Sequence, residues 1–100
     1  MTEKQKTYAD DLRKIVKSST IKTIENEMML KKMKLDVEKI KKSALLFIDE
    51  SLTDSWLLAK SSSIKFHFNA SEIMQIALHT VYQKTNSEAA IASYKKRLGV

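Results

Sequence analysis

The sequence predicts an all-α domain, and three observations support this prediction. The chain has no proline and a single glycine, Gly99, although tight turns between strands usually need these residue types. Apolar residues recur at spacings of three and four through most of the chain, which is the period of an amphipathic helix. The chain also has no linker and no internal repeat, so its 100 residues are expected to form one helical domain over 1–100 with a modest core.

Two helices are expected before residue 33. Thr7, with Asp10 three residues later, resembles a capping box and predicts an N-terminal helix over about 7–18. The run Ser18-Ser19-Thr20 is expected to interrupt this helix and to cap a second one that ends near Lys32. The apolar stripes of the two helices consist of Tyr8, Leu12, Ile15, Val16, Ile21, Ile24 and Met28.

A long central helix is the dominant predicted element. Asp36 is its expected N-cap, and the helix should extend over roughly 25 residues at 1.5 Å each. Its apolar stripe consists of Val37, Ile40, Ala44, Leu45, Ile48, Leu52, Trp56 and Ala59. Further apolar residues, Leu46, Phe47, Leu57 and Leu58, lie off this stripe. A helix that is apolar on more than one face is either central in its fold or meets two partners.

The segment after this helix is predicted to be a strand. Residues 64–68, Ile-Lys-Phe-His-Phe, alternate between apolar and polar side chains, which is the period of a strand. One strand cannot stand alone, so it should pair with another chain or with a distant loop. Two capping-box patterns, Asn69 with Glu72 and Thr85 with Glu88, predict the starts of the last two helices. The final helix should span about 86–98, with Gly99 as its C-terminal cap.

The sequence contains no recognisable catalytic or cofactor-binding motif. Its two histidines have no cysteine partners, because the chain has no cysteine, and no phosphate-binding or zinc-protease motif is present. The carboxylates of Asp49, Glu50 and Asp54 are best explained as the solvated edge of the long helix. We therefore expect a binding protein that is not an enzyme and uses no cofactor or metal.

The order of elements and the residues from Leu45 onward resemble the histone fold. The long helix carries Leu46-Phe47-Ile48-Asp49, then Ser55-Trp56, then Ala59, and the next helix carries Asn69, Glu72-Ile73 and Ala77. These patterns are similar to those of core histones, of CCAAT-binding-factor subunits, and of small polymerase and remodelling-complex subunits. The histone-fold-like core would cover about 19–83. Two departures from the pattern are a serine-rich second loop and the lack of an arginine that usually pairs with an acid of the third helix.

The resemblance implies a chain that pairs with a second histone-fold chain and contributes to chromatin or DNA binding. The implied core and partner interface consists of Leu45, Phe47, Ile48, Leu52, Trp56, Ala59, Ile64, Phe66, Ile73, Ile76 and Ala77. The implied contacts with the backbone of double-stranded DNA are Lys31, Lys32, Lys34, Lys60, Ser61, Ser62, Ser63 and Lys65. The net charge of +6 agrees with an acidic partner.

Two other functions fit the same sequence. One is a ribbon-helix-helix transcriptional regulator, a homodimer whose ribbon is 63–68 and whose helices are 69–84 and 87–98. The other is a small helical modulator or immunity-type protein that binds another protein. The polar N-terminal residues and the short apolar runs give no sign of a secretory signal or of a membrane span. We expect an intracellular protein, nuclear in a eukaryote and otherwise cytoplasmic or nucleoid-associated.

Overall fold

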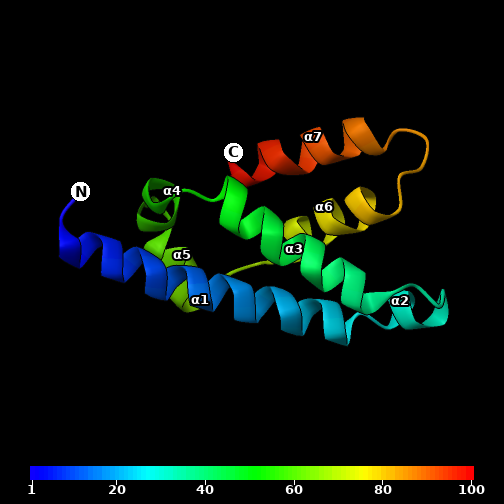
Figure 1. Cartoon of the computed structure of the whole chain (residues 1–100), viewed down its shortest axis with the longest axis horizontal. Helices are drawn as coiled ribbons and strands as arrows, with labels where there is room; N and C mark the ends of the chain where they lie inside the picture. Colours follow the sequence, from blue (N-terminus) through cyan, green and yellow to red (C-terminus); the bar gives the residue numbers. More distant parts are fainter.

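The computed structural model describes residues 1–100 as seven helices without a strand. The helices are α1 (Glu3–Asn26), α2 (Met28–Lys32), α3 (Val37–Ser51), α4 (Asp54–Ala59), α5 (Ser61–His67), α6 (Ser71–Val81) and α7 (Ser87–Leu98). The molecule measures 44 × 25 × 20 Å. In Figure 1, α1 runs along one side, α3 and α6 occupy the middle, α7 lies on the opposite side, and α2 projects at one end. The all-helical prediction is confirmed.

The first helix is longer than predicted and has no break. Thr2, not Thr7, caps α1: its hydroxyl accepts the Gln5 N–H, and the Gln5 side chain accepts the Thr2 N–H. The predicted interruption at 18–20 is wrong, because the hydroxyl of buried Thr20 donates to the Val16 carbonyl at 2.7 Å. A hydroxyl within a helix that donates to a carbonyl of the preceding turn does not interrupt the helix.

The predicted long helix is two helices. Asp36 caps α3 as expected, since its carboxylate accepts the Lys39 N–H at 3.2 Å. The helix then ends at Ser51, and Thr53, in extended conformation, caps α4 by accepting the Trp56 N–H at 3.1 Å. The prediction of one continuous helix is wrong because the apolar spacing of three and four continues across a break in the backbone.

The predicted strand over 64–68 is also wrong, because Ser61–His67 form α5. Ile64 is buried and Phe68 is half-buried, whereas Phe66 between them is 86% exposed. This pattern is helical, since positions four apart share a face and a position two apart lies on the other side. The ribbon on which the ribbon-helix-helix alternative depends is therefore absent from this structure.

The hydrophobic core lies among α1, α3, α4 and α6. Its fully buried large side chains include Leu12, Val16, Ile24, Ile40, Ile48, Leu52, Leu57, Ile73 and Ile76. The helix α6 packs against α1, α3 and α7. It therefore joins α1 and α3 to α7.

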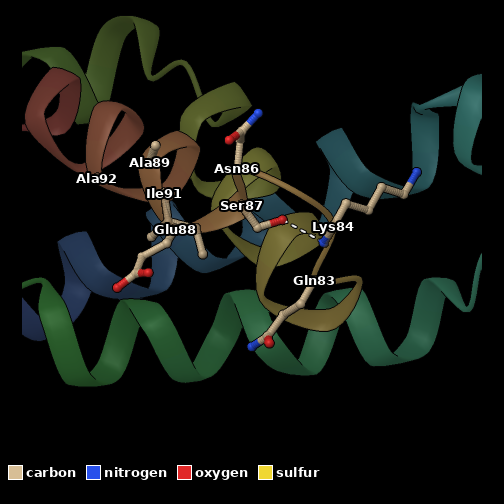
Figure 2. Close-up of a pocket in the computed structure, with 8 residues that line it drawn as sticks. All are labelled: Gln83, Lys84, Asn86, Ser87, Glu88, Ala89, Ile91 and Ala92. Atoms are coloured by element: carbon tan, nitrogen blue, oxygen red, sulfur yellow. Dashed lines mark hydrogen bonds between the residues drawn. The ribbon is translucent and has the colours of Figure 1, made fainter.

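The turn between α6 and α7 is fixed by Ser87. Its hydroxyl accepts the Lys84 N–H at 2.8 Å (Figure 2). The same hydroxyl lies 3.1 Å from His79 Nδ1. The predicted Thr85–Glu88 capping box is wrong, because Asn86 is the N-cap and makes no side-chain cap bond. At the other end of α7, Gly99 (φ 85°) donates to the Lys95 and Lys96 carbonyls, so the predicted glycine cap is confirmed.

The predicted capping box at Asn69 is wrong in detail. Ala70 is the N-cap of α6 and makes no side-chain cap bond. Asn69 instead accepts the Ser71 N–H at 2.9 Å. The helix nevertheless begins within two residues of the predicted position.

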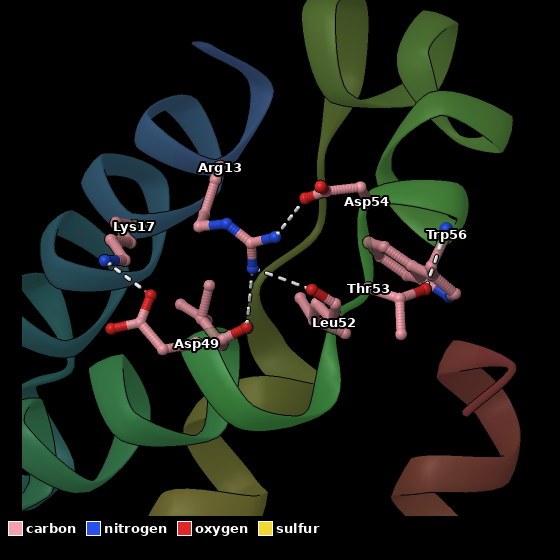
Figure 3. A network of polar contacts seen from close by, with 8 residues as sticks. Arg13, Lys17, Asp49, Leu52, Thr53, Asp54 and Trp56 are labelled. Carbon is pink, nitrogen blue, oxygen red and sulfur yellow. Dashed lines mark hydrogen bonds and ion pairs between the residues drawn. The ribbon is translucent and has the colours of Figure 1, made fainter. Parts of the chain in front are cut away.

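Arg13 joins three helices at the break between α3 and α4 (Figure 3). Its guanidinium donates to the carbonyls of Ile48 at 3.1 Å and Leu52 at 2.7 Å, and to the Asp54 carboxylate at 2.7 Å. The last carbonyls of a helix have no partner within it. Arg13 therefore satisfies the end of α3 and fixes the start of α4 at once. We call this cluster the Arg13 junction.

Candidate functional site at the tip of α2

The projecting segment 28–34, here called the α2 tip, is a short helix capped by a side chain at its start and closed by its own backbone at its end. Glu27 caps it by accepting the Met29 N–H at 3.2 Å. At its other end, the N–H groups of Leu35 and Lys34 donate to the carbonyls of Leu30 and Lys31, each at 3.1 Å. These paired bonds are the Schellman arrangement that ends many helices. Leu30 is the only buried residue of α2.

Lys34 adopts a left-handed backbone conformation with φ of 55°. Glycine usually occupies this position of a helix C-terminal motif, because a Cβ there costs free energy. Strained residues of this kind are concentrated at functional sites. A lysine in place of glycine is therefore consistent with a role for its side chain rather than for its backbone.

The α2 tip exposes three methionines. Met28 is 67% exposed, Met29 58% and Met33 51%. Three of the five methionines of the chain thus lie in six residues. Met29 and Met33 are four residues apart, and the Met33 N–H bonds to the Met29 carbonyl at 3.0 Å. Their side chains therefore lie on the same side of the tip.

Lys31, Lys32 and Lys34 stand among these methionines, and all three are exposed. None of them takes part in any of the ion pairs of the molecule, which involve Arg13, Lys17 and Lys41. No acidic residue lies between Glu27 and Asp36. The α2 tip therefore presents apolar side chains and uncompensated positive charge together.

The base of the tip is anchored to α6. The Asp36 N–H donates to the Tyr82 hydroxyl at 2.7 Å, and buried Leu30 belongs to the main hydrophobic core. These two contacts give a small segment with few buried groups a defined position on the body of the protein.

The structure separates the two basic segments that the sequence assigned to DNA. Lys31, Lys32 and Lys34 lie at the α2 tip, whereas Lys60 caps α4 and Ser61, Ser62, Ser63 and Lys65 belong to α5. Figure 1 shows α5 in the half of the molecule that holds the N-terminus, well away from α2. One chain therefore does not bring these segments together.

Lys65 is engaged within the chain. Its ammonium lies 4.6 Å from the centroid of the Tyr8 ring. Hydrogen bonding to Lys65, and more weakly to Ser61, lowers the pKa of the Tyr8 phenol, because a donor favours its ionised form. The side chain of Lys65 thus contacts α1.

Most of the residues implied for the core or partner interface are inaccessible in the single chain. The structure buries Phe47, Ile48, Leu52, Ile64, Ile73, Ile76 and Ala77, and it half-buries Leu45 and Trp56. Ala59 and Phe66 are exposed and do not belong to the core. A role for these two at a partner interface stays a prediction.

Met29, Met33 and Arg13 were not among the residues predicted to be functional. The composition of residues 28–34 could have indicated the exposed methionines. This segment contains only methionine, leucine and lysine, and it lacks the polar uncharged residues that usually solvate a loop. Arg13 gave no such signal, since its partners are 35 to 41 residues away in the sequence.

The structure contains neither a metal-binding cluster nor a helix able to span a membrane. No group of three or more His, Cys, Asp or Glu side chains is placed to hold a metal ion. None of the seven helices combines the length and the apolar character needed to cross a bilayer. Comparison of the chain with known protein families, curated proteins and solved structures finds no match.

Proposed function

We propose that this chain is a non-enzymatic binding protein that inserts its α2 tip into an apolar groove, rimmed by acidic side chains, on a partner protein. The observation that supports this proposal most directly is the exposure of Met28, Met29 and Met33 among three uncompensated lysines. The proposal corresponds to the protein-binding modulator that the sequence also allowed.

The methionines supply the apolar part of the proposed contact. Methionine side chains are flexible and polarizable, and they are used at binding surfaces that adapt to their partners. A group of exposed apolar side chains is a mark of an interaction site. Because the α2 tip projects from the body of the molecule (Figure 1), its complement is a concave surface.

The lysines define the charge of the partner. Lys31 and Lys32 follow Met28 by three and four residues, so they lie beside it on the helix surface. A partner groove with an acidic rim would bury the methionines while it neutralises the lysines. Complementary charge of this kind mainly speeds association and selects the partner.

The partner can be sought with a photo-reactive amino acid placed in the full chain at position 29 or 33. Matched chains carry the same group at position 89 or 92, which are exposed on α7. We expect one protein to be cross-linked from the tip positions and not from the α7 positions, through a segment that contains Asp or Glu. The proposal is wrong if the tip positions yield no more cross-linked protein than the α7 positions.

The purified partner then permits a quantitative test. We compare M28Q/M29Q/M33Q, K31E/K32E/K34E and a control, K6E/K14E/K22E, which reverses three exposed lysines of α1. Each tip variant should weaken binding by about tenfold or more, the range of a few lost interface contacts, and the control by far less. Equal weakening by the control and the tip charge variant would mean that only net charge matters.

Contact with the phosphate backbone of double-stranded DNA is a second candidate, because Lys31, Lys32 and Lys34 are exposed and unpaired. Lysines hold phosphates without reading the bases, so such binding would have little sequence preference and would fall steeply with salt. The methionine variant separates the two candidates. DNA binding should survive M28Q/M29Q/M33Q and be lost in K31E/K32E/K34E.

Pairing with a histone-fold chain stays a prediction. It depended on a continuous central helix and on a strand that finds its partner in the other chain, and the structure has α3, α4 and α5 at these positions. The core of the single chain is also closed enough to bury Ile48, Leu52 and Ile76. Light scattering of the isolated chain tests this prediction, which requires a dimer or a chain that is poorly soluble alone.

A further inference from the structure

A small pocket lies where α4, α5, α6 and the last turn of α7 meet, and we call it the α4–α7 pocket. It has a volume of about 180 Å³, and its wall includes Trp56, Lys60, Ser63, His67, Glu72 and Arg97. None of these residues belongs to the α2 tip. Pockets for drug-sized ligands are typically about 300–1,000 Å³, so this one has room only for a small chemical group.

The wall contributed by Trp56 is held in place. The indole N–H donates to the Leu98 carbonyl at 2.9 Å, which joins α4 to the end of α7. A Cβ on Gly99 would lie 3.8 Å from the indole nitrogen, which is an ordinary van der Waals contact with this edge of the ring. The side of the pocket formed by Trp56 is therefore a fixed aromatic ring.

The charged groups of the pocket are not neutralised by one another. Lys60 and Arg97 carry two positive charges against the single negative charge of Glu72, and none of the three takes part in an ion pair. The guanidinium carbon of Arg97 lies 5.3 Å from the Tyr94 ring centroid, a contact that limits its motion. The Ser63 hydroxyl and the His67 ring add further hydrogen-bonding groups.

We propose that the α4–α7 pocket binds a small anionic group, a carboxylate or a phosphate, through Arg97 and Lys60. The planar guanidinium presents paired donors that match the oxygens of either group. The proposal rests on different residues from the proposed docking of the α2 tip, and either can fail without the other.

The test is a titration of the isotope-labelled full chain, followed by the NMR signals of its backbone and of the Trp56 indole N–H. Sodium phosphate and sodium acetate are added in separate experiments, with sodium chloride used to keep the ionic strength constant. We expect saturable shifts confined to the residues of the pocket. The anion that saturates at the lower concentration identifies the preferred chemistry.

Three substitutions to glutamine sharpen the test. R97Q should weaken binding by about tenfold or more, the usual factor for one lost charged hydrogen bond. E72Q should strengthen it by about twofold to fivefold, because a like charge is removed from the site. K96Q, which neutralises the exposed neighbour of Arg97 on α7, should leave the affinity unchanged.

R97Q and E72Q are expected to change the affinity in opposite directions and K96Q to leave it unchanged, so a general loss of fold cannot produce the expected pattern. Shifts that grow linearly with both anions, that spread over the surface, or that K96Q and R97Q change equally would overturn the proposal. So would an E72Q protein that binds neither anion more tightly than the parent.

Discussion

The Arg13 junction and the α2 tip both lie where one helix ends and the next begins, but they use their positive charges in opposite ways. At the junction, the Arg13 guanidinium is 17% exposed and donates to two carbonyls and a carboxylate of its own chain. At the tip, three exposed lysines have no acidic partner. Arg13 is satisfied within the chain and fixes its fold, whereas the lysines of the α2 tip remain available to another molecule.

The largest expected effect contrasts an apolar deletion at the centre of the hydrophobic core, Ile48, with one where the α2 tip joins that core, Leu30. Ile48 is fully buried beside the junction, so Ile48→Ala should lower the free energy of unfolding by about 3–5 kcal/mol. Leu30 is the single buried residue of α2, and Leu30→Ala should cost only about 2 kcal/mol because the short segment can collapse around it. Urea unfolding measures both values. Equal losses would show that the tip belongs to the cooperative core.

The next largest loss of unfolding free energy is expected for a substitution of Arg13, which contacts both sides of the break between α3 and α4. Arg13→Gln removes hydrogen bonds to a carboxylate and to two helix-end carbonyls, so it should cost about 2–3 kcal/mol. Lys14→Gln changes the exposed neighbour and should stay within about 0.5 kcal/mol of the parent. If the two variants melt alike, the junction does not stabilise the fold.

A smaller effect is expected where the tip is anchored. Tyr82→Phe removes the hydroxyl that accepts the Asp36 N–H, so it should cost about 1 kcal/mol. Amide hydrogen exchange should become faster in residues 33–36 and stay unchanged in α3. A uniform increase throughout the molecule would instead mean that the anchor is part of the global fold.

The smallest expected effect has the opposite sign. Lys34→Gly places glycine where the backbone is left-handed, and should raise the free energy of unfolding by about 0.5–1 kcal/mol, which thermal melting can resolve. The same variant should weaken partner binding by removing a lysine of the tip. A protein that becomes more stable and also binds more tightly would contradict a binding role for Lys34.

Local features of the sequence predicted the helical class and two of the helix ends. The absence of proline and the scarcity of glycine indicated helices, and Asp36 and Gly99 cap helices as expected. Such caps depend on residues within four positions of one another, so the sequence displays them directly.

The strand at 64–68 was predicted because the two-residue period of a strand and the 3.6-residue period of a helix both place residues 64 and 68 on one face. Ile64 and Phe68 share a face both in a strand and in a helix, so only Phe66 distinguishes the two structures. In a strand Phe66 would join them, but in α5 it is 86% exposed. The apolar side chain of Phe66 favours a buried position. The packing of α5 against α1 nevertheless leaves Phe66 on the exposed face of the helix.

The break after Ser51 could not be predicted from apolar spacing. Leu52 and Trp56 continue the stripe of α3 across it, and the main stabilising contact comes from Arg13, far away in the sequence. The candidate site was predicted in part, because the three tip lysines were identified from the sequence. The methionines beside them were not, since Met28 was assigned to the apolar stripe of a longer helix and their exposure depends on how α2 projects from the fold.

The hydrogen bond between Trp56 and Leu98 has a practical consequence, because Trp56 is the only tryptophan of the chain. Its fluorescence reports on the contact between α4 and the end of α7, beside the α4–α7 pocket. If the last helix frays before the rest of the protein unfolds, the emission will shift while the circular dichroism of the remaining helices is still native. The protein thus carries an intrinsic optical probe that can distinguish local opening at its C-terminal helix from global denaturation.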